Sequence, residues 1–219
     1  MESRVNLFSL RSVAIALVPC ALAAFAPSAG AFEGGDWLVR AGVSIVDPQS
    51  DNGLIHLNKV AEAPPSDLSI DSAASFTFNV SYFCTPSVAV ELLAAYPFSH
   101  DLELTDVNLH GSVDHLPPTL SVQYHFSLGE HVKPYVGAGV NWTIFSNEDV
   151  DAPGVHVSID DSVGPAFQIG SDFPLNDHWL VNVDVRWIQI EGDVEINHVN
   201  VGNVRVNPFV YGLNVGYKF

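Results

Sequence analysis

The sequence is poor in basic residues. Eight lysines and arginines stand against 25 aspartates and glutamates, which gives a formal net charge of −17. This balance argues against nucleic acid as a partner and against a polybasic membrane anchor. Cysteine is also scarce, and neither the two cysteines nor the nine histidines show the spacing of a zinc site. We therefore expect no metal site, and since no nucleotide-binding or haem motif is present, no cofactor.

The N-terminal apolar run is too short for a membrane-spanning helix. It covers residues 13–25 and contains Pro19, whereas a helix needs roughly 20 residues to cross the hydrocarbon layer. The run follows two arginines and precedes small residues at 29–31, a pattern typical of a secretory signal peptide. We expect residues 1–31 to be cleaved, which leaves residues 32–219 as one domain. Cys84 would then be its single cysteine, so no disulfide could form within the mature chain.

Apolar residues nevertheless make up 47% of the chain, and in eight segments they alternate with polar ones. The first segment has Trp37, Val39 and Ala41 on one face and Leu38 and Arg40 on the other. A period of two is the pattern of a β-strand with one apolar face. The predicted strands are residues 37–45, 75–82, 88–96, 119–126, 136–144, 167–173, 179–187 and 209–219.

Short and long connections alternate between these strands. The short turns lie at residues 85–87, 127–132 and 174–178, and the long loops at 47–72, 99–114, 146–162 and 191–203. The long loops hold 17 acidic residues and a single basic one, Lys59. All the long loops should therefore lie on one solvated, acidic side of the molecule.

The pattern predicts an all-β fold, an eight-stranded antiparallel transmembrane β-barrel in the bacterial outer membrane. Closure leaves no unpaired strand edge in lipid, and outer-membrane barrels have short turns on the periplasmic side and long loops outside. A soluble sandwich or lipocalin-like barrel also alternates, but its apolar side chains point inward. Here aromatic residues mark both ends of the outward rows, as membrane-interface belts do: Trp37, Tyr82, Phe98, Tyr124, Trp142, Trp187 and Tyr217.

Five segments spread along the mature chain carry more specific motifs: AVELLAAYPFSHDL (89–102), HLPPTLSVQYHF (115–126), KPYVGAGVNWTIF (133–145), DHWLVNVDVRWIQI (177–190) and NVGYKF (214–219). Together they resemble the OmpW family of outer-membrane proteins, which includes AlkL-type proteins. The resemblance implies a barrel for passive uptake of small hydrophobic molecules, which leave sideways into the membrane. The terminal Phe219 is typical of chains inserted by the barrel-assembly machinery. Expected partners are thus this machinery, outer-membrane lipid with lipopolysaccharide, and small hydrophobic molecules.

The strand directions place several charged side chains inside the barrel. Eight strands enclose an interior that side chains nearly fill, which argues against a wide water channel. Buried charges persist when they are paired, so we expect an ion-pair plug that closes the periplasmic half. A gating or proton-linked role for the same groups is the alternative. The predicted plug residues are Arg40, Glu91, Lys133, Asp184, Arg186 and Lys218.

Nearer the long loops, the inward positions become apolar. This change predicts a chamber suited to a lipophile, with apolar residues of the first loop as its lid. The plainer interpretation is that these side chains cap the barrel core. The predicted chamber residues are Leu93, Phe145, Ile188 and Ile190, with Leu54, Ile55 and Leu57 from the loop.

Three prolines, Pro97, Pro117 and Pro118, lie at the loop-side ends of the third and fourth strands. Proline donates no hydrogen bond to a strand ladder, so the seam between these strands should be weak and could open sideways. Alternatively the prolines merely end the strands.

Enzyme activity is not expected. The sequence His125-Phe126-Ser127 resembles the His-x-Ser of lipid-deacylating barrels, but it falls at the periplasmic side and no acid is placed to orient the imidazole. The first hypothesis is therefore a passive conduit for hydrophobic compounds. The second is a structural or adhesive barrel with a packed core and no transport.

Overall fold

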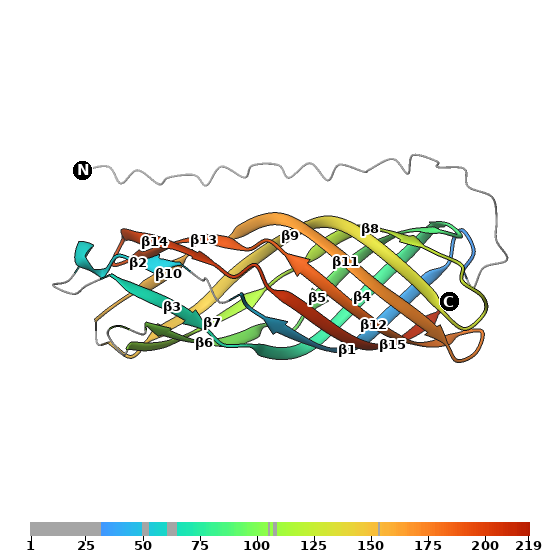
Figure 1. Ribbon diagram of the computed structural model, residues 1–219, viewed down its shortest axis with the longest axis horizontal. Coiled ribbons are helices and arrows are strands. Elements are labelled where there is room, and N and C mark those ends of the chain that lie inside the picture. The colour runs from blue at the N-terminus through green and yellow to red at the C-terminus, as the bar shows by residue number, and fades with distance from the viewer. Residues whose placement is uncertain (1–31, 50–52, 61–64, 105, 107–108, 153) are drawn as a thin grey trace, which may run out of the picture.

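The computed structural model describes residues 32–49, 53–60, 65–104, 106, 109–152 and 154–219 (Figure 1). The predicted signal segment, residues 1–31, lies outside the described residues. In the part of the chain that is described, no helix has the length and apolar character needed to cross a membrane. The helical element there is a short 3-10 turn, Leu57–Lys59.

Eight antiparallel strands form a closed barrel. Each strand pairs with the next around the ring, and the last pairs with the first. The strands are β1 (Trp37–Asp47), β4 (Ala73–Thr85), β5 (Val88–Ala95), β8 (Thr119–His125), β9 (Lys133–Val150), β11 (Ser162–Pro174), β12 (Trp179–Ile188) and β15 (Phe209–Lys218). The predicted eight-stranded barrel is confirmed, and each predicted strand overlaps one of these strands.

The barrel exposes apolar side chains and buries polar ones. On the outer face Phe76 is 65% exposed and Leu213 61% exposed, whereas the inward Arg40 and Glu91 are fully buried. This distribution is the reverse of that in a soluble protein, where large apolar patches are covered. Water cannot be the solvent around this outer face, so the exposed band is the surface that meets lipid.

The two ends of the barrel differ, as the alternation of connections predicts (Figure 1). Short turns join β4 to β5, β8 to β9 and β11 to β12 at the end that carries the C-terminus, here called the turn end. The other end is extended by further strands, here called the crown. They are β2 (Leu54–Ile55), β3 (Ser66–Ile70), β6 (Phe98–Leu104), β7 (Leu109–Leu116), β10 (Val157–Ile159), β13 (Glu191–Ile196) and β14 (Val199–Arg205).

The crown differs from the predicted long loops, because much of it is ordered sheet. The β6–β7 hairpin continues β5 and β8, and it pairs on one side with β3 and on the other with the far end of β9. A second sheet joins β10, β13 and β14. The acidic residues of these segments made them look like solvated loops in the sequence. In β6, however, Asp101 and Glu103 alternate with Leu102 and Leu104, which is the pattern of a strand. The acids face outward while the apolar side chains of the crown pack inside it.

Candidate functional site

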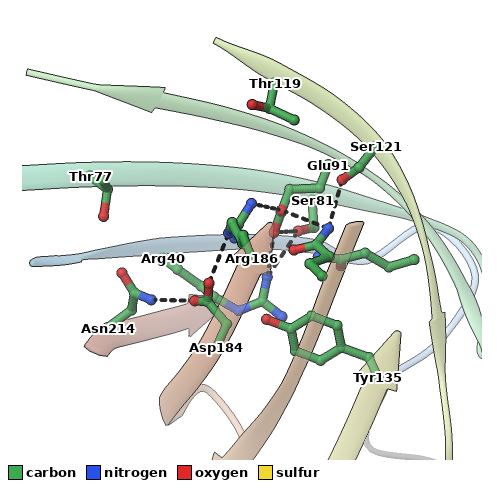
Figure 2. Close-up of polar contacts among 12 residues, drawn as sticks. Arg40, Thr77, Ser81, Glu91, Thr119, Ser121, Tyr135, Asp184, Arg186 and Asn214 are labelled. Carbon is green, nitrogen blue, oxygen red and sulfur yellow. Dashed lines mark hydrogen bonds and ion pairs between the residues drawn. The ribbon is translucent and has the colours of Figure 1, made fainter. Parts of the chain in front are cut away.

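The barrel interior at mid-height holds a network of five charged side chains, here called the charge network. Glu91 on β5 accepts hydrogen bonds from two guanidinium groups, those of Arg40 at 3.1 Å and Arg186 at 2.9 Å. Arg40 also donates two hydrogen bonds to Asp172, at 3.0 and 2.7 Å, and Arg186 donates one to Asp184 at 2.8 Å. Figure 2 shows Arg40 of β1 and Glu91 of β5 converging with Asp184 and Arg186, which both lie on β12. The network thus ties opposite walls of the barrel together.

Neutral polar groups surround the charge network and donate further hydrogen bonds to its carboxylates. Gln168 donates to Glu91 and to the hydroxyl of Ser121, and Ser81 donates to Glu91. Asn182 donates to Asp172, and Asn214 to Asp184. A buried charge is tolerated when it has an ion-pair partner and hydrogen bonds. These neutral groups therefore help to stabilise the five charged side chains in the interior of the barrel.

Glycines on the inward face leave room for these side chains. A Cβ atom added at Gly212 would lie 2.6 Å from a carboxylate oxygen of Asp184, and one at Gly170 would lie 2.5 Å from the Tyr135 ring. Tyr135 in turn lies under the Arg40 guanidinium, whose central carbon is 5.3 Å from the ring centroid. The network therefore depends on small residues as well as on charged ones.

Four of the six predicted plug residues meet in the charge network, and two do not. Lys218 lies at the turn end, where its ammonium is 3.9 Å from Asp36. Lys133 also lies there, lining a cavity of about 500 Å³ at the mouth of the barrel, and the described residues give it no ion pair. Lys133 is the first residue of β9 and Lys218 the last residue of β15, so both lie at the mouth of the barrel instead of mid-height.

Sequence reasoning missed Asp172, which makes the paired contact with Arg40. The signal was present, since Asp172 shares the polar face of its strand with Gln168, four residues earlier. It lies close to the end of β11, however, and the strand tilt that brings it level with Arg40 on β1 becomes known only from the register.

An aromatic layer closes the barrel between the charge network and the turn end. Phe32 stacks on Phe83 with ring centroids 4.1 Å apart, and His125 packs between these rings and Tyr135. The Nε2 atom of His125 is 3.0 Å from the side-chain oxygen of Gln123. The imidazole of the His-x-Ser sequence is therefore part of the barrel core.

Above the charge network, the interior is apolar. A cluster of buried side chains fills the upper barrel and the crown, here called the apolar chamber: Val46, Ile55, Leu57, Leu68, Ala73, Phe98, Val113, Ile159, Ala166, Ile188, Ile190, Val194, Ile196, Val201, Val204, Val206 and Val210. The half-buried Phe145 packs against it. Two cavities of about 20 and 60 Å³ lie within it.

The predicted chamber residues divide in the structure. Ile188, Ile190, Ile55 and Leu57 belong to the apolar chamber, and Phe145 borders it. Leu93 is buried but lies outside this cluster. It is the last residue of β5 that pairs with β8 before an interruption in the strand ladder. Leu54 does not line the chamber, since it is 44% exposed. Adjacent residues of a strand point to opposite faces, so β2 can direct Ile55 inward only by turning Leu54 outward.

The strand ladder is interrupted next to the chamber. Pairing between β5 and β8 stops at Leu93 and Thr119, and pairing between β6 and β7 begins at Phe98 and His115. Four residues on one side face three on the other, and the three predicted seam prolines, Pro97, Pro117 and Pro118, lie in this stretch. The pairing of β1 with β4, by contrast, runs unbroken from Trp37 to Val46. We call the interrupted stretch the seam.

Two histidines of the crown are buried in the chamber wall. The rings of His100 and His115 stack with centroids 4.8 Å apart, and His115 also stacks on Phe98. Burial lowers the pKa of His115 to about 3, with the neighbouring His100 lowering it further against the opposing effect of Asp114. Burial likewise lowers the pKa of His100. Both imidazoles are therefore neutral near pH 7.

The lowered pKa of His115 predicts that the crown loosens in acid. A free histidine gains a proton below about pH 6.5, whereas the buried ring stays neutral, so an opened crown binds more protons. The closed state should thus keep its full stability above about pH 6.5 and lose roughly 2 kcal/mol between pH 6.5 and 5. Hydrogen exchange of β6 and β7 amides, corrected for intrinsic rates, should accelerate over this interval while β1 amides stay protected. His115→Phe should flatten the dependence, and an unchanged dependence would assign it to other groups.

Comparisons with known proteins agree with this architecture. The model of the OmpW family matches residues 33–219. Outer membrane protein W of Vibrio cholerae is 34% identical, covering 86% of this chain and 91% of the relative. Outer membrane protein AlkL of Ectopseudomonas oleovorans is 32% identical, covering 89% and 86%. The crystal structure of OprG from Pseudomonas aeruginosa superposes with a TM-score of 0.73 at 32% identity, covering 85% of this chain and 97% of OprG.

Proposed function

Because the chain belongs to the OmpW family of outer-membrane proteins, we propose that it takes up small hydrophobic molecules. The barrel resides in the outer membrane, with the lipid bilayer around its apolar outer face. In our proposal a lipophile enters the apolar chamber through the crown, which outer-membrane barrels direct outward. It then leaves through the seam into the hydrocarbon layer, without catalysis.

One observation carries the proposal: the apolar chamber ends on the charge network, and the break in the wall lies just above that network. Glu91 pairs with Ser121 two rungs before the pairing of β5 with β8 stops. A lipophile that descended further would have to separate the buried Arg40, Glu91 and Arg186, which lie 2.9–3.1 Å from their partners. Separating buried ion pairs costs several kcal/mol. The seam offers a shorter route, because Ala95 within it packs against the chamber and Phe98 at its edge belongs to the chamber.

The scaffold alternative, a structural or adhesive barrel without transport, is not favoured. Such a barrel does not need an apolar chamber beside an interrupted wall, since a continuous ladder would satisfy every backbone group of the two strands. We also propose that the acidic outer surface of the crown contacts lipopolysaccharide through divalent cations. In the same proposal, the barrel-assembly machinery recognises the exposed Phe219.

Substitution of Ile188 tests the proposed route. Ile188 is buried at the floor of the chamber, next to Arg186. Ile188→Asn places an amide where an apolar ligand cannot bind it, at a cost of roughly 1–3 kcal/mol. Transfer of decane into proteoliposomes should fall about five- to 100-fold, whereas Ile188→Val should leave the rate within about two-fold. Folding of each variant is checked by the heat-dependent gel shift. If both folded variants transfer decane no faster than liposomes without protein, the proposed uptake of hydrophobic molecules is contradicted.

A further inference from the structure

The wall of the apolar chamber contains polar atoms without a partner. The side chains of His100 and His115 are 2% and 3% exposed, and the Nε2 atom of each is buried and accepts or donates no hydrogen bond within the described residues. Both rings line the cavity of about 20 Å³, whose other walls are apolar, among them Leu68, Leu102 and Ile159. A buried polar atom that lacks a hydrogen bond costs about 1–3 kcal/mol, so two in one small cavity indicate a place for a polar group.

The hydrogen bonding of His100 fixes what its free nitrogen can do. Its Nδ1 lies 2.6 Å from the backbone carbonyl oxygen of Asp71, which can only accept, so Nδ1 carries the proton and donates it. In a neutral imidazole the other nitrogen then has a lone pair and no hydrogen. The Nε2 of His100 is therefore an acceptor, and its partner must be a donor.

We propose that this histidine pair binds the hydroxyl group of a lipophile, so that the preferred substrates are apolar molecules with one hydroxyl, such as long-chain alcohols. The hydroxyl donates to Nε2 of His100, while its oxygen can accept from His115. This inference rests on the proposed function and narrows its substrate class. An alkane leaves both nitrogens without partners, and a carboxylate cannot donate to His100.

The shape of the chamber agrees with such a ligand. The histidine cavity has room for one group of the size of a water molecule, for which about 10–15 Å³ is needed. The neighbouring cavity of about 60 Å³ shares Leu68, Leu102 and Ile159 with it and is otherwise lined mainly by apolar side chains. A hydroxyl head would thus lie between the histidines, with the first carbon atoms of the alkyl tail in the larger cavity. Sites of this kind, apolar with a few placed polar groups, are typical of small-molecule binding.

Nitrogen chemical shifts of the histidines test binding directly. The full mature barrel, with ¹⁵N-labelled histidine in lipid nanodiscs, is titrated with 1-decanol and separately with decane. Decanol should shift the Nε2 resonance of His100, and decane should not. His178 at the turn end serves as an internal reference, and His100→Asn assigns the signal while keeping an amide N–H for the Asp71 carbonyl. Equal shifts with both ligands, or none with decanol, would overturn the inference and show a cavity that holds water alone.

A second measurement separates this inference from the proposed function. In proteoliposomes the wild-type barrel should transfer decanol faster than decane, relative to protein-free liposomes, by about three- to ten-fold, the effect of one hydrogen bond. The double variant His100→Asn/His115→Phe should lose this preference, so that the ratio of decanol transfer to decane transfer falls to that of protein-free liposomes. Equal stimulation of both probes by wild type would refute the hydroxyl site and leave the conduit intact. Stimulation of neither probe would refute the conduit, and the nitrogen shifts would then decide the site by themselves.

Discussion

Replacing Glu91 with alanine is expected to lower the free energy of unfolding by about 3–5 kcal/mol. The two guanidinium groups of Arg40 and Arg186 would remain fully or almost fully buried after losing the carboxylate between them. Arg40 would keep Asp172 and Arg186 would keep Asp184, but each guanidinium would lose the acceptor of one of its N–H groups, and both donors would stay buried without a partner. The measurement is urea unfolding of the barrel in lipid vesicles, followed by tryptophan fluorescence.

A surface ion pair of the same chemical type supplies the matched control. Glu191 lies 4.0 Å from Arg205 in the crown, with both side chains more than 40% exposed. Solvent screens such a pair, so Glu191→Ala should change the free energy of unfolding by less than about 1 kcal/mol. A similar decrease in the free energy of unfolding for Glu91→Ala and Glu191→Ala would mean that water reaches the charge network. The network would then not close the barrel.

The barrel itself could be predicted from the sequence because its pattern is local. Alternation with period two depends on neighbouring residues, and it located all eight barrel strands and the short turns between them. The crown could not be predicted in the same way. Its strands are shorter and their outward positions are acidic, so the sequence of β6 and β13 indicates solvated loops although Leu102 and Val194 lie on their inner faces.

The sequence predicted that a charge network would form, but the predicted set of residues was incomplete. Period two placed Arg40, Glu91 and Arg186 inside, and their opposite charges indicated pairing. Which groups share a level depends on strand tilt and register, and these are long-range properties that also decided the positions of Asp172 and Lys133. The histidine pair was missed for a related reason, since His100 and His115 are 15 residues apart and meet through the β6–β7 register.

Locking the seam with a disulfide is expected to stop lateral release, which is the largest functional effect that this account predicts. Leu92 and Leu120 are register partners on the outer face of β5 and β8, next to the interrupted stretch. Opposed residues of antiparallel strands are about 4.5–5.5 Å apart at Cα, within the range that a disulfide spans. In a Cys84→Ser background, oxidised Leu92→Cys/Leu120→Cys should keep the seam from widening and reduce decane transfer at least ten-fold.

The matched control is a disulfide of the same kind on an uninterrupted pair of strands. Val43 and Phe76 are outward register partners on β1 and β4. A disulfide between Val43→Cys and Phe76→Cys, in the same Cys84→Ser background, should leave the transfer rate unchanged in oxidised and reduced protein. Any loss in this control would report a general effect of cross-linking on the barrel.

The most direct test of lateral uptake is therefore the rate of decane transfer by one preparation of Leu92→Cys/Leu120→Cys barrels before and after reduction. The account predicts slow transfer while the seam is oxidised and recovery of the wild-type rate once a reductant has opened the disulfide. A locked barrel that transfers decane as fast as the wild type would contradict it, because the hydrophobic molecule would then leave by a route other than the seam.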